Sequence, residues 1–298
     1  MRVFVTGASG WIGSATVAEL LAAGHQVLGL ARSDAAAATI TAAGADVHRG
    51  GLDDLESLRT GAESSDGVVH LAYVHDFSRM EDAARTDLAA VETIGDVLAG
   101  TDRPFLIASG VLGLATGRAA VETDHPDVTV HHRLATAQKV LALADRGVRS
   151  AVVRFAPTVH GAGGDHGFVA TLAGIAREKG VSAYIGDGAN HWPAVHRLDA
   201  GRLVRLGVDA APAGSVLHAV AEEGVPTRVI AEALGRSLDL PVASVGADEA
   251  GAHFGWIGAF FAADAPTSSE LTRKLLDWTP TGPTIVEDID AGHYFRAP

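Results

Sequence analysis

Short apolar runs alternate with longer alanine- and leucine-rich stretches through the first half of the chain. The short runs predict strands, and the stretches between them predict helices. We expect strands at Arg2–Val5, Gln26–Leu30, Asp46–His48, Gly67–Leu71, Phe105–Ala108 and Ala151–Phe155, and helices at Ile12–Ala23, Asp82–Leu98 and His132–Arg146. Because this alternation is typical of βαβ units, it predicts an α/β fold with a doubly wound parallel sheet.

The pattern changes after Pro157, where glycines crowd between His160 and Gly167 and a second loop-rich stretch follows at Gly186. A strand at Ser215–Val220 is expected to return to the sheet, and a helix is expected near Ser268–Leu276. We therefore predict a first domain of residues 1–157, to which residues 192–220 return. Residues 158–191 and 221–298 would form a second, smaller, discontinuous domain that holds the substrate.

Residues 6–13 read TGASGWIG and connect the first predicted strand directly to the first predicted helix. Glycines in this spacing and context allow a tight turn, a close approach of the backbone to a pyrophosphate and close packing of helix on strand. The helix N-terminus would then bind the phosphates. A glycine turn without a ligand is the alternative. The motif predicts a Rossmann-type dinucleotide site with contacts from Gly7, Ser9, Gly10, Trp11, Ile12 and Gly13.

Composition and charge limit which molecules the protein can bind and where it can work. The chain has 298 residues, of which 47% are hydrophobic and 20% charged, as in an ordinary globular protein. A net charge of −13 argues against nucleic acid as a partner, and no apolar stretch approaches the roughly 18 residues that a membrane span needs. The absence of cysteine excludes disulfides and thiol catalysis and is consistent with the cytoplasm. The first strand begins at Arg2, so we expect no signal peptide. The remaining class of partner is a small-molecule substrate, which is the one we expect.

The end of the second strand indicates which dinucleotide is preferred. Arg32 and Ser33 offer a guanidinium group and a hydroxyl group, which suit the 2′-phosphate of NADP. Asp34 is counter-evidence, because a carboxylate there can bond the ribose of NAD. We predict NADP, with NADPH preferred over NADH. Further cofactor contacts are expected after the third strand, at Leu52 and Asp53, and after the fourth, at Leu71, Ala72 and Tyr73.

The chain as a whole resembles the extended short-chain dehydrogenase/reductase family, which includes epimerases, dehydratases and carbonyl reductases. The resemblance rests on TGASGWIG at 6–13, HLAY at 70–73, ASG at 108–110, RFAPTVHG at 154–161 and AVHRLDAGRL at 194–203. It implies that Pro157 and Val159 lie along the nicotinamide. It also implies a homodimer through the helices at Asp82–Leu98 and His132–Arg146.

One expected catalytic group is missing. Members of the family normally carry a serine and a YxxxK pair, in which the lysine lowers the pKa of the tyrosine and binds the nicotinamide ribose. Lys139 matches the lysine and Ser109 the serine, but Ala135 stands at the tyrosine position. Lys139 would then position the cofactor. The candidates for a replacement acid are His131, Tyr73 and His75, the last of which Asp76 could orient.

No metal site is predicted, because His191 and His196 do not form a metal motif by themselves, although with Trp192 they could line the cleft. The leading hypothesis is an NADPH-dependent reductase acting on a C=O or C=N bond of a small to medium apolar substrate. The alternative is a redox sensor or interaction protein that binds NADP without turning it over. An epimerase or dehydratase of sugar nucleotides is disfavoured, because those reactions use the tyrosine as a base.

Overall fold

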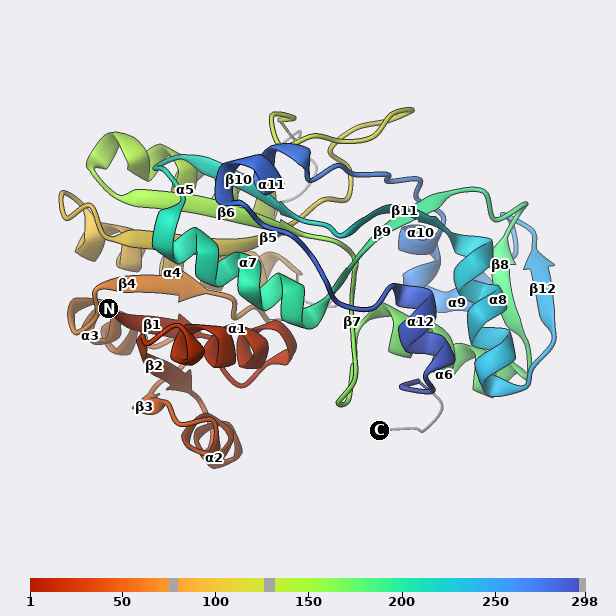
Figure 1. Ribbon diagram of the computed structural model, residues 1–298, viewed down its shortest axis with the longest axis horizontal. Coiled ribbons are helices and arrows are strands. Elements are labelled where there is room, and N and C mark those ends of the chain that lie inside the picture. The colour runs from red at the N-terminus through yellow and green to blue at the C-terminus, as the bar shows by residue number, and fades with distance from the viewer. Residues whose placement is uncertain (75–79, 126–131, 295–298) are drawn as a thin grey trace.

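The computed structural model describes residues 1–74, 80–125 and 132–294. Within these ranges the largest element is a seven-stranded sheet in the order β10-β6-β5-β4-β1-β2-β3, with every pair parallel (Figure 1). Its strands are β1 (Arg2–Thr6), β2 (Gln26–Ala31), β3 (Asp46–Arg49), β4 (Gly67–His70), β5 (Pro104–Gly110), β6 (Arg149–Phe155) and β10 (Ser215–Ala219). The predicted doubly wound α/β fold is confirmed.

Helices cover both faces of this sheet. One face carries α1 (Trp11–Ala22), α2 (Asp34–Ala42) and α7 (Arg197–Ala210), and the other carries α3 (Leu55–Glu63), α4 (Met80–Leu98) and α5 (His132–Ala142). Side chains alternate between the faces: Val3 and Val5 of β1 belong to the core under α1, whereas Phe4 belongs to the core under α4. The 3-10 turn η1 (Leu143–Arg146) follows α5, so this α-helix is shorter than predicted.

Helix α1 packs closely against α7, its neighbour on the same face of the sheet. A Cβ atom on Gly201 of α7 would lie only 2.8 Å from the backbone carbon of Ala15, so glycine lets the two helices touch. This close packing fixes the position of α1 relative to the sheet.

A second, smaller unit lies beyond the carboxyl ends of the strands (Figure 1). It contains a three-stranded sheet in the order β11-β9-β7 and a parallel pair of strands, β12 and β8. Its strands are β7 (Thr158–His160), β8 (Ser182–Ile185), β9 (His191–His196), β11 (Glu222–Pro226) and β12 (Val242–Val245). Its helices are α6 (Phe168–Lys179), α8 (Thr227–Leu238), α9 (Ala250–Phe254), η2 (Gly255–Ile257), α10 (Gly258–Phe261) and α12 (Ile285–Asp290).

The chain crosses between the two units several times. Strand β9 pairs with β7 and β11 and not with the large sheet, so the return expected at residue 192 begins with α7. Helix α11 (Glu270–Leu276) packs on β10, and the chain then passes back to the second unit before α12. The domain boundaries given above stay a prediction.

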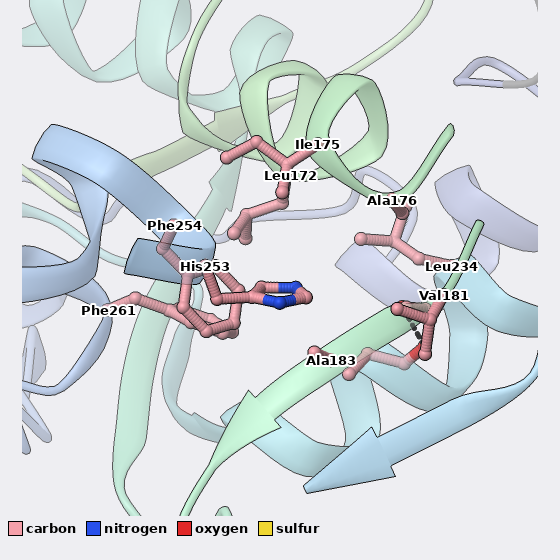
Figure 2. A pocket seen from close by; sticks show the side chains of 11 residues that line it. Leu172, Ile175, Ala176, Val181, Ala183, Leu234, His253, Phe254 and Phe261 are labelled. Atoms are coloured by element: carbon pink, nitrogen blue, oxygen red, sulfur yellow. Dashed lines mark hydrogen bonds between the residues drawn. The ribbon is translucent and has the colours of Figure 1, made fainter. Parts of the chain in front are cut away.

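The core of the second unit holds a small apolar cavity of about 10 Å³, barely the room that one water needs. Figure 2 shows the imidazole of His253 pointing into it between Leu172 and Ala183. His253 Nε2 is buried there without a hydrogen-bond partner among the described residues. Across residues 1–74, 80–125 and 132–294, no helix combines the length and the apolar character that crossing a bilayer requires.

Candidate functional site

The TGASGWIG segment forms a tight turn at the carboxyl end of β1. This is the point where the strand order reverses between β1 and β4, where open α/β sheets bind ligands. Gly7 has φ +71°, a left-handed conformation that favours glycine, and a Cβ atom on it would lie 2.8 Å from the amide nitrogen of Ala72. The N–H of Gly10 donates to the carbonyl of Gly7 at 2.9 Å and closes the turn.

The third glycine brings the helix onto the strand. A Cβ atom on Gly13 would lie 1.9 Å from the carbonyl oxygen of Gly7, a distance at which no side chain fits. Gly10 is the N-cap of α1 and has no side chain that could cap the first amides of the helix. These amides point out of the helix N-terminus at the edge of the sheet, and they fit the phosphates of a dinucleotide.

A buried chain of hydrogen bonds fixes the strand ends around this turn. Thr6 Oγ1 lies 2.9 Å from His70 Nδ1, and His70 Nε2 lies 3.1 Å from Asp87 Oδ1 on α4. Thr6 Oγ1 also accepts the N–H of Ala72 at 3.2 Å. The partners imply that Nδ1 accepts from Thr6 and that Nε2–H donates to Asp87. Sequence reasoning missed these hydrogen bonds, although Thr6 and His70 both lie in the quoted motifs.

Arg197, the first residue of α7, flanks the turn, and sequence reasoning did not single it out. The guanidinium carbon of Arg197 lies 4.2 Å above the ring of Trp11, and its NH2 group donates to Ser14 Oγ at 3.0 Å. Trp11 in turn donates its indole N–H to the carbonyl of Val159 at 2.6 Å. Burial lowers the pKa of Arg197, and nearby Asp165 opposes the shift. These contacts attach β7 and the start of α7 to the N-terminus of α1.

The end of β2 carries the predicted determinants of cofactor preference. Arg32 is exposed, and no hydrogen bond or ion pair joins it to the described part of the chain. The hydroxyl of Ser33 accepts the N–H of Ala36 at 3.2 Å and caps α2. Asp34 pairs with Arg49 at 2.7 Å, and Arg49 lies beside the end of β2 in the β2–β3 register. Arg49 is therefore a second cation at this edge, and the sequence analysis did not name it.

The other predicted cofactor residues follow strand ends on the same edge. Asp53 is exposed after β3, and Leu52 packs partly into the core under α3. The N–H of Leu71 donates to the carbonyl of Thr6 at 3.2 Å, which holds the start of the segment Leu71–Tyr73 against β1. Pro157 is half-buried between β6 and β7.

Three of the predicted catalytic residues, Ser109, Tyr73 and Lys139, lie among the described residues. Ser109 is buried near the end of β5, opposite Arg154 of β6. Lys139 lies seven residues into α5, about 10 Å from the helix start that faces the carboxyl edge. It forms a 2.6 Å ion pair with Glu92 of α4, and both side chains are half exposed. The cofactor role of Lys139 stays a prediction, and this partner favours a surface ion pair between helices.

Lys139 also lines a groove of about 340 Å³ between α4 and α5, which Ala135 borders as well. The predicted homodimer uses these two helices, and it stays a prediction. His75 and His131 lie outside the described residues, so the structure does not place them.

The three tyrosines of the sequence have different surroundings. Tyr294 is buried and donates its hydroxyl hydrogen to Asp165 at 2.7 Å, and burial raises the pKa of Tyr294. Tyr184 lies on β8 with the guanidinium of Arg228 5.5 Å from its ring. Tyr73 is half-buried and follows β4 at the edge that carries the glycine turn. Of the three, Tyr73 is the one that follows a strand of the large sheet.

The residues expected to line a cleft, His191, Trp192 and His196, all lie on β9. Trp192 is fully buried and His196 nearly so, because β9 is the central strand of the three-stranded sheet. Burial lowers the pKa of His196, and nearby Asp288 opposes this. His191 pairs with Asp264 at 3.0 Å. The described residues contain no cluster of three or more histidine, aspartate or glutamate side chains that could hold a metal ion.

The parallel sheet and the glycine turn at its switch point define a dinucleotide-binding Rossmann protein. A model of the NAD dependent epimerase/dehydratase family matches residues 3–219. The chain belongs to this family, as the resemblance in the sequence predicted.

Two fungal proteins are similar over their full length. An uncharacterised protein of Schizosaccharomyces pombe is 47% identical, and the match covers 99% of this chain and 100% of that protein. An uncharacterised protein of Saccharomyces cerevisiae is 45% identical, and the match covers 98% of this chain and 99% of that protein. A ketoreductase of Stigmatella aurantiaca, which acts on a 4-hydroxy-2-methyl-3-oxo-4-farnesyl-3,4-dihydroquinoline-1-oxide, is 34% identical over 42% of this chain and 39% of its own.

Solved structures of sugar-nucleotide enzymes share the fold. A UDP-glucose 4-epimerase of Thermotoga maritima, in complex with UDP-glucose, superposes with a TM-score of 0.79 at 17% identity over 99% of this chain and 98% of its own. MoeE5 in complex with UDP-glucose and NAD superposes with a TM-score of 0.76 at 20% identity, over 99% and 98%. At this identity the likeness shows the fold alone.

Proposed function

We propose that the protein is an NADP(H)-dependent reductase that acts on a C=O or C=N bond of a small to medium apolar substrate. The observation that carries the proposal is the close packing of Gly13 on Gly7. This packing places the N-terminal amides of α1 at the switch point of the sheet, where they can bind the phosphates of a dinucleotide. The partial likeness to a ketoreductase supports reduction as the reaction.

Tyr73 is our choice for the proton donor. It follows β4 on the edge that carries the glycine turn, whereas Tyr184 and Tyr294 are held in the second unit. The chemistry that a bound NADPH would supply is donation of a hydride to the carbonyl carbon, which oxidises it to NADP⁺. Tyr73 would donate its phenolic proton to the carbonyl oxygen of the substrate, so that the product is an alcohol. Solvent then returns a proton to the tyrosine.

The preference for NADPH is proposed from two arginines. Arg32 and Arg49 lie at the ends of adjacent strands, where the 2′-phosphate of NADP would meet two guanidinium groups. Asp34 holds Arg49 in the structure and would have to yield it to the phosphate. Both side chains of this pair are more than half exposed, so breaking it costs little, about 0–1 kcal/mol.

The experiment is a titration with NADPH followed by NADPH consumption against ketones, diketones and cyclic imines. Tyr73→Phe should lower kcat on ketones by about 100-fold, because general acids typically contribute that much or more, and should leave NADPH affinity unchanged. Tyr184→Phe is the matched control and should keep full activity. Equal kcat values for wild type and Tyr73→Phe would exclude Tyr73 as the acid.

A non-catalytic NADP-binding sensor is the second candidate. It is favoured by Ala135 at the tyrosine position together with the pairing of Lys139 with Glu92. Tight binding of NADPH without turnover of any compound in the panel would select the sensor. Turnover of UDP-glucose instead would select a sugar-nucleotide enzyme.

A further inference from the structure

Arg197 joins α7, α1 and the loop 161–167 beside the candidate dinucleotide site. Its guanidinium group lies over the ring of Trp11 at 4.2 Å, donates to Ser14 Oγ at 3.0 Å and donates to the carbonyl of Ala162 at 3.1 Å. Trp11 and Ser14 belong to the first turn of α1, whose N-terminal amides have no side-chain cap. These contacts therefore hold the arginine at the end of the helix where the phosphates of a dinucleotide would bind.

The loop 161–167 is shaped to admit this side chain. Gly161 has φ +152°, and a Cβ atom on it would lie 2.9 Å from Cγ of Arg197. Gly163 has φ +102°, and a Cβ atom there would lie 3.3 Å from Nη1 of the same arginine. His166 of the loop also meets the ring of Trp11 edge-on at 6.4 Å. The guanidinium group is thus held between the loop and α1, so its position is set before a ligand binds.

The positive charge of Arg197 has no ion-pair partner across residues 1–74, 80–125 and 132–294. Asp165 acts on it without forming an ion pair, and accepts instead the hydroxyl hydrogen of Tyr294 at 2.7 Å. Asp199, in the first turn of α7, is paired with Arg202 at 3.1 Å. The N-terminus of α1 carries about half a positive charge of its own. Two positive charges that lie side by side with no carboxylate bound between them attract an anion.

The guanidinium group also keeps hydrogen-bond donors for such an anion. Ser14 and Ala162 engage one N–H on each terminal nitrogen, and the second N–H on each has no acceptor in the described part of the chain. Nε is buried, likewise without an acceptor there. Paired N–H groups in one plane match two oxygens of a phosphate group.

We propose that Arg197 binds the diphosphate of the dinucleotide together with the amides at the N-terminus of α1. This inference rests on the proposed function. NADPH and NADH carry the same diphosphate, so Arg197 strengthens the binding of both alike. Arg32 and Arg49 differ from it, because their proposed contact is with the 2′-phosphate that NADPH alone carries.

The test is fluorescence titration with NADPH and with NADH, each at low and at high NaCl concentration. Arg197→Met keeps a stem over Trp11 and removes the charge, and should weaken both dinucleotides about tenfold at low salt. Arg197→Lys lacks the planar fork but keeps the charge, and should stay within about threefold of wild type. Arg202→Met is the matched control: it removes the same charge from α7, but Arg202 bonds to Thr279 and Thr281, and it should change neither affinity.

Salt separates a charge that binds phosphate from a side chain that only holds the loop in place. Dissolved ions screen the charge, so the ratio of wild-type to Arg197→Met affinity should shrink at high NaCl. Equal losses in the lysine and methionine variants, with a ratio that does not vary with salt, would overturn the inference. A loss confined to NADPH, or no loss at all, would overturn it as well. If Arg197→Met does not fold, Arg197→Gln takes its place in the comparison with lysine. A wild-type protein that binds neither dinucleotide would refute the proposed function itself.

Discussion

Replacing Gly13 by alanine adds one methyl group at the contact between α1 and the turn after β1. The new Cβ atom would lie 1.9 Å from the carbonyl oxygen of Gly7, and real Cβ atoms essentially never approach a heavy atom closer than 3.0 Å. The helix and the turn must therefore separate until at least that distance is reached. The obstacle is backbone and not the end of a flexible side chain, so rotation of a side chain cannot relieve it.

Two contacts oppose this separation. Helix α1 is not free to shift along the sheet, because Ala15 is packed against Gly201 of α7, the neighbouring helix on the same face. The turn cannot retreat either, because Gly7 is packed against the backbone of Ala72. Overpacking of a core usually costs 1–3 kcal/mol, and with backbone on both sides we expect a loss of about 3 kcal/mol or more for Gly13→Ala.

Urea unfolding followed by circular dichroism measures this loss, and NADPH fluorescence measures binding. Gly174→Ala is the matched control: it also replaces a helical glycine, but its added Cβ meets open space in α6 and should stabilise the protein by about 0.5–1 kcal/mol. Gly13→Ala should also lose dinucleotide binding, because the turn no longer closes. A Gly13→Ala protein with wild-type stability and wild-type NADPH affinity would refute the geometry of the site.

Three further predictions concern single side chains. Arg32→Ala and Arg49→Ala should each weaken NADPH binding about tenfold and leave NADH binding unchanged in fluorescence titrations, because a charge-assisted bond to the 2′-phosphate is lost; equal loss for both dinucleotides would refute the assignment. Lys139→Ala should change stability by less than about 1 kcal/mol, since its pair with Glu92 is half exposed, and should weaken NADPH binding in a fluorescence titration; an unchanged Kd would contradict the predicted cofactor role of Lys139. Burial lowers the pKa of His253 in the folded protein below its value in the unfolded chain. As pH falls through about 6.5, the unfolded chain therefore binds a proton at His253 that the folded protein does not, and the fold loses stability. His253→Leu should therefore gain stability over wild type as pH falls from 7.5 to 5.5, and a difference that does not vary with pH would contradict this.

The glycine turn could be predicted because its determinants are local. The positive φ of Gly7 and the contact of Gly13 with Gly7 arise within seven consecutive residues. The strand before them and the helix after them leave little freedom in how the segment folds. The parallel sheet was predictable for a similar reason, since each buried strand is a short apolar run between loops.

Lys139 shows where the local pattern stops being informative. Counting from Ala135 gives the spacing of a catalytic pair, but spacing does not tell which face of α5 meets the sheet edge. Helix α4 packs beside α5 and places Glu92 2.6 Å from Lys139, a contact that the spacing does not predict. The same limit applies to Trp192, whose burial follows from the placement of β9 between two other strands.

The sequence by itself therefore determined the class of fold, the dinucleotide turn and the strand ends that surround it. Tertiary structure alone decided which side chains of separate elements meet: Arg197 over Trp11, Asp87 behind His70, and His166 against Trp11. The physical reason is that turns and strands follow from backbone conformation and the alternation of apolar residues over a few positions. Contacts between separate elements depend on how whole elements pack, which no short stretch of sequence encodes.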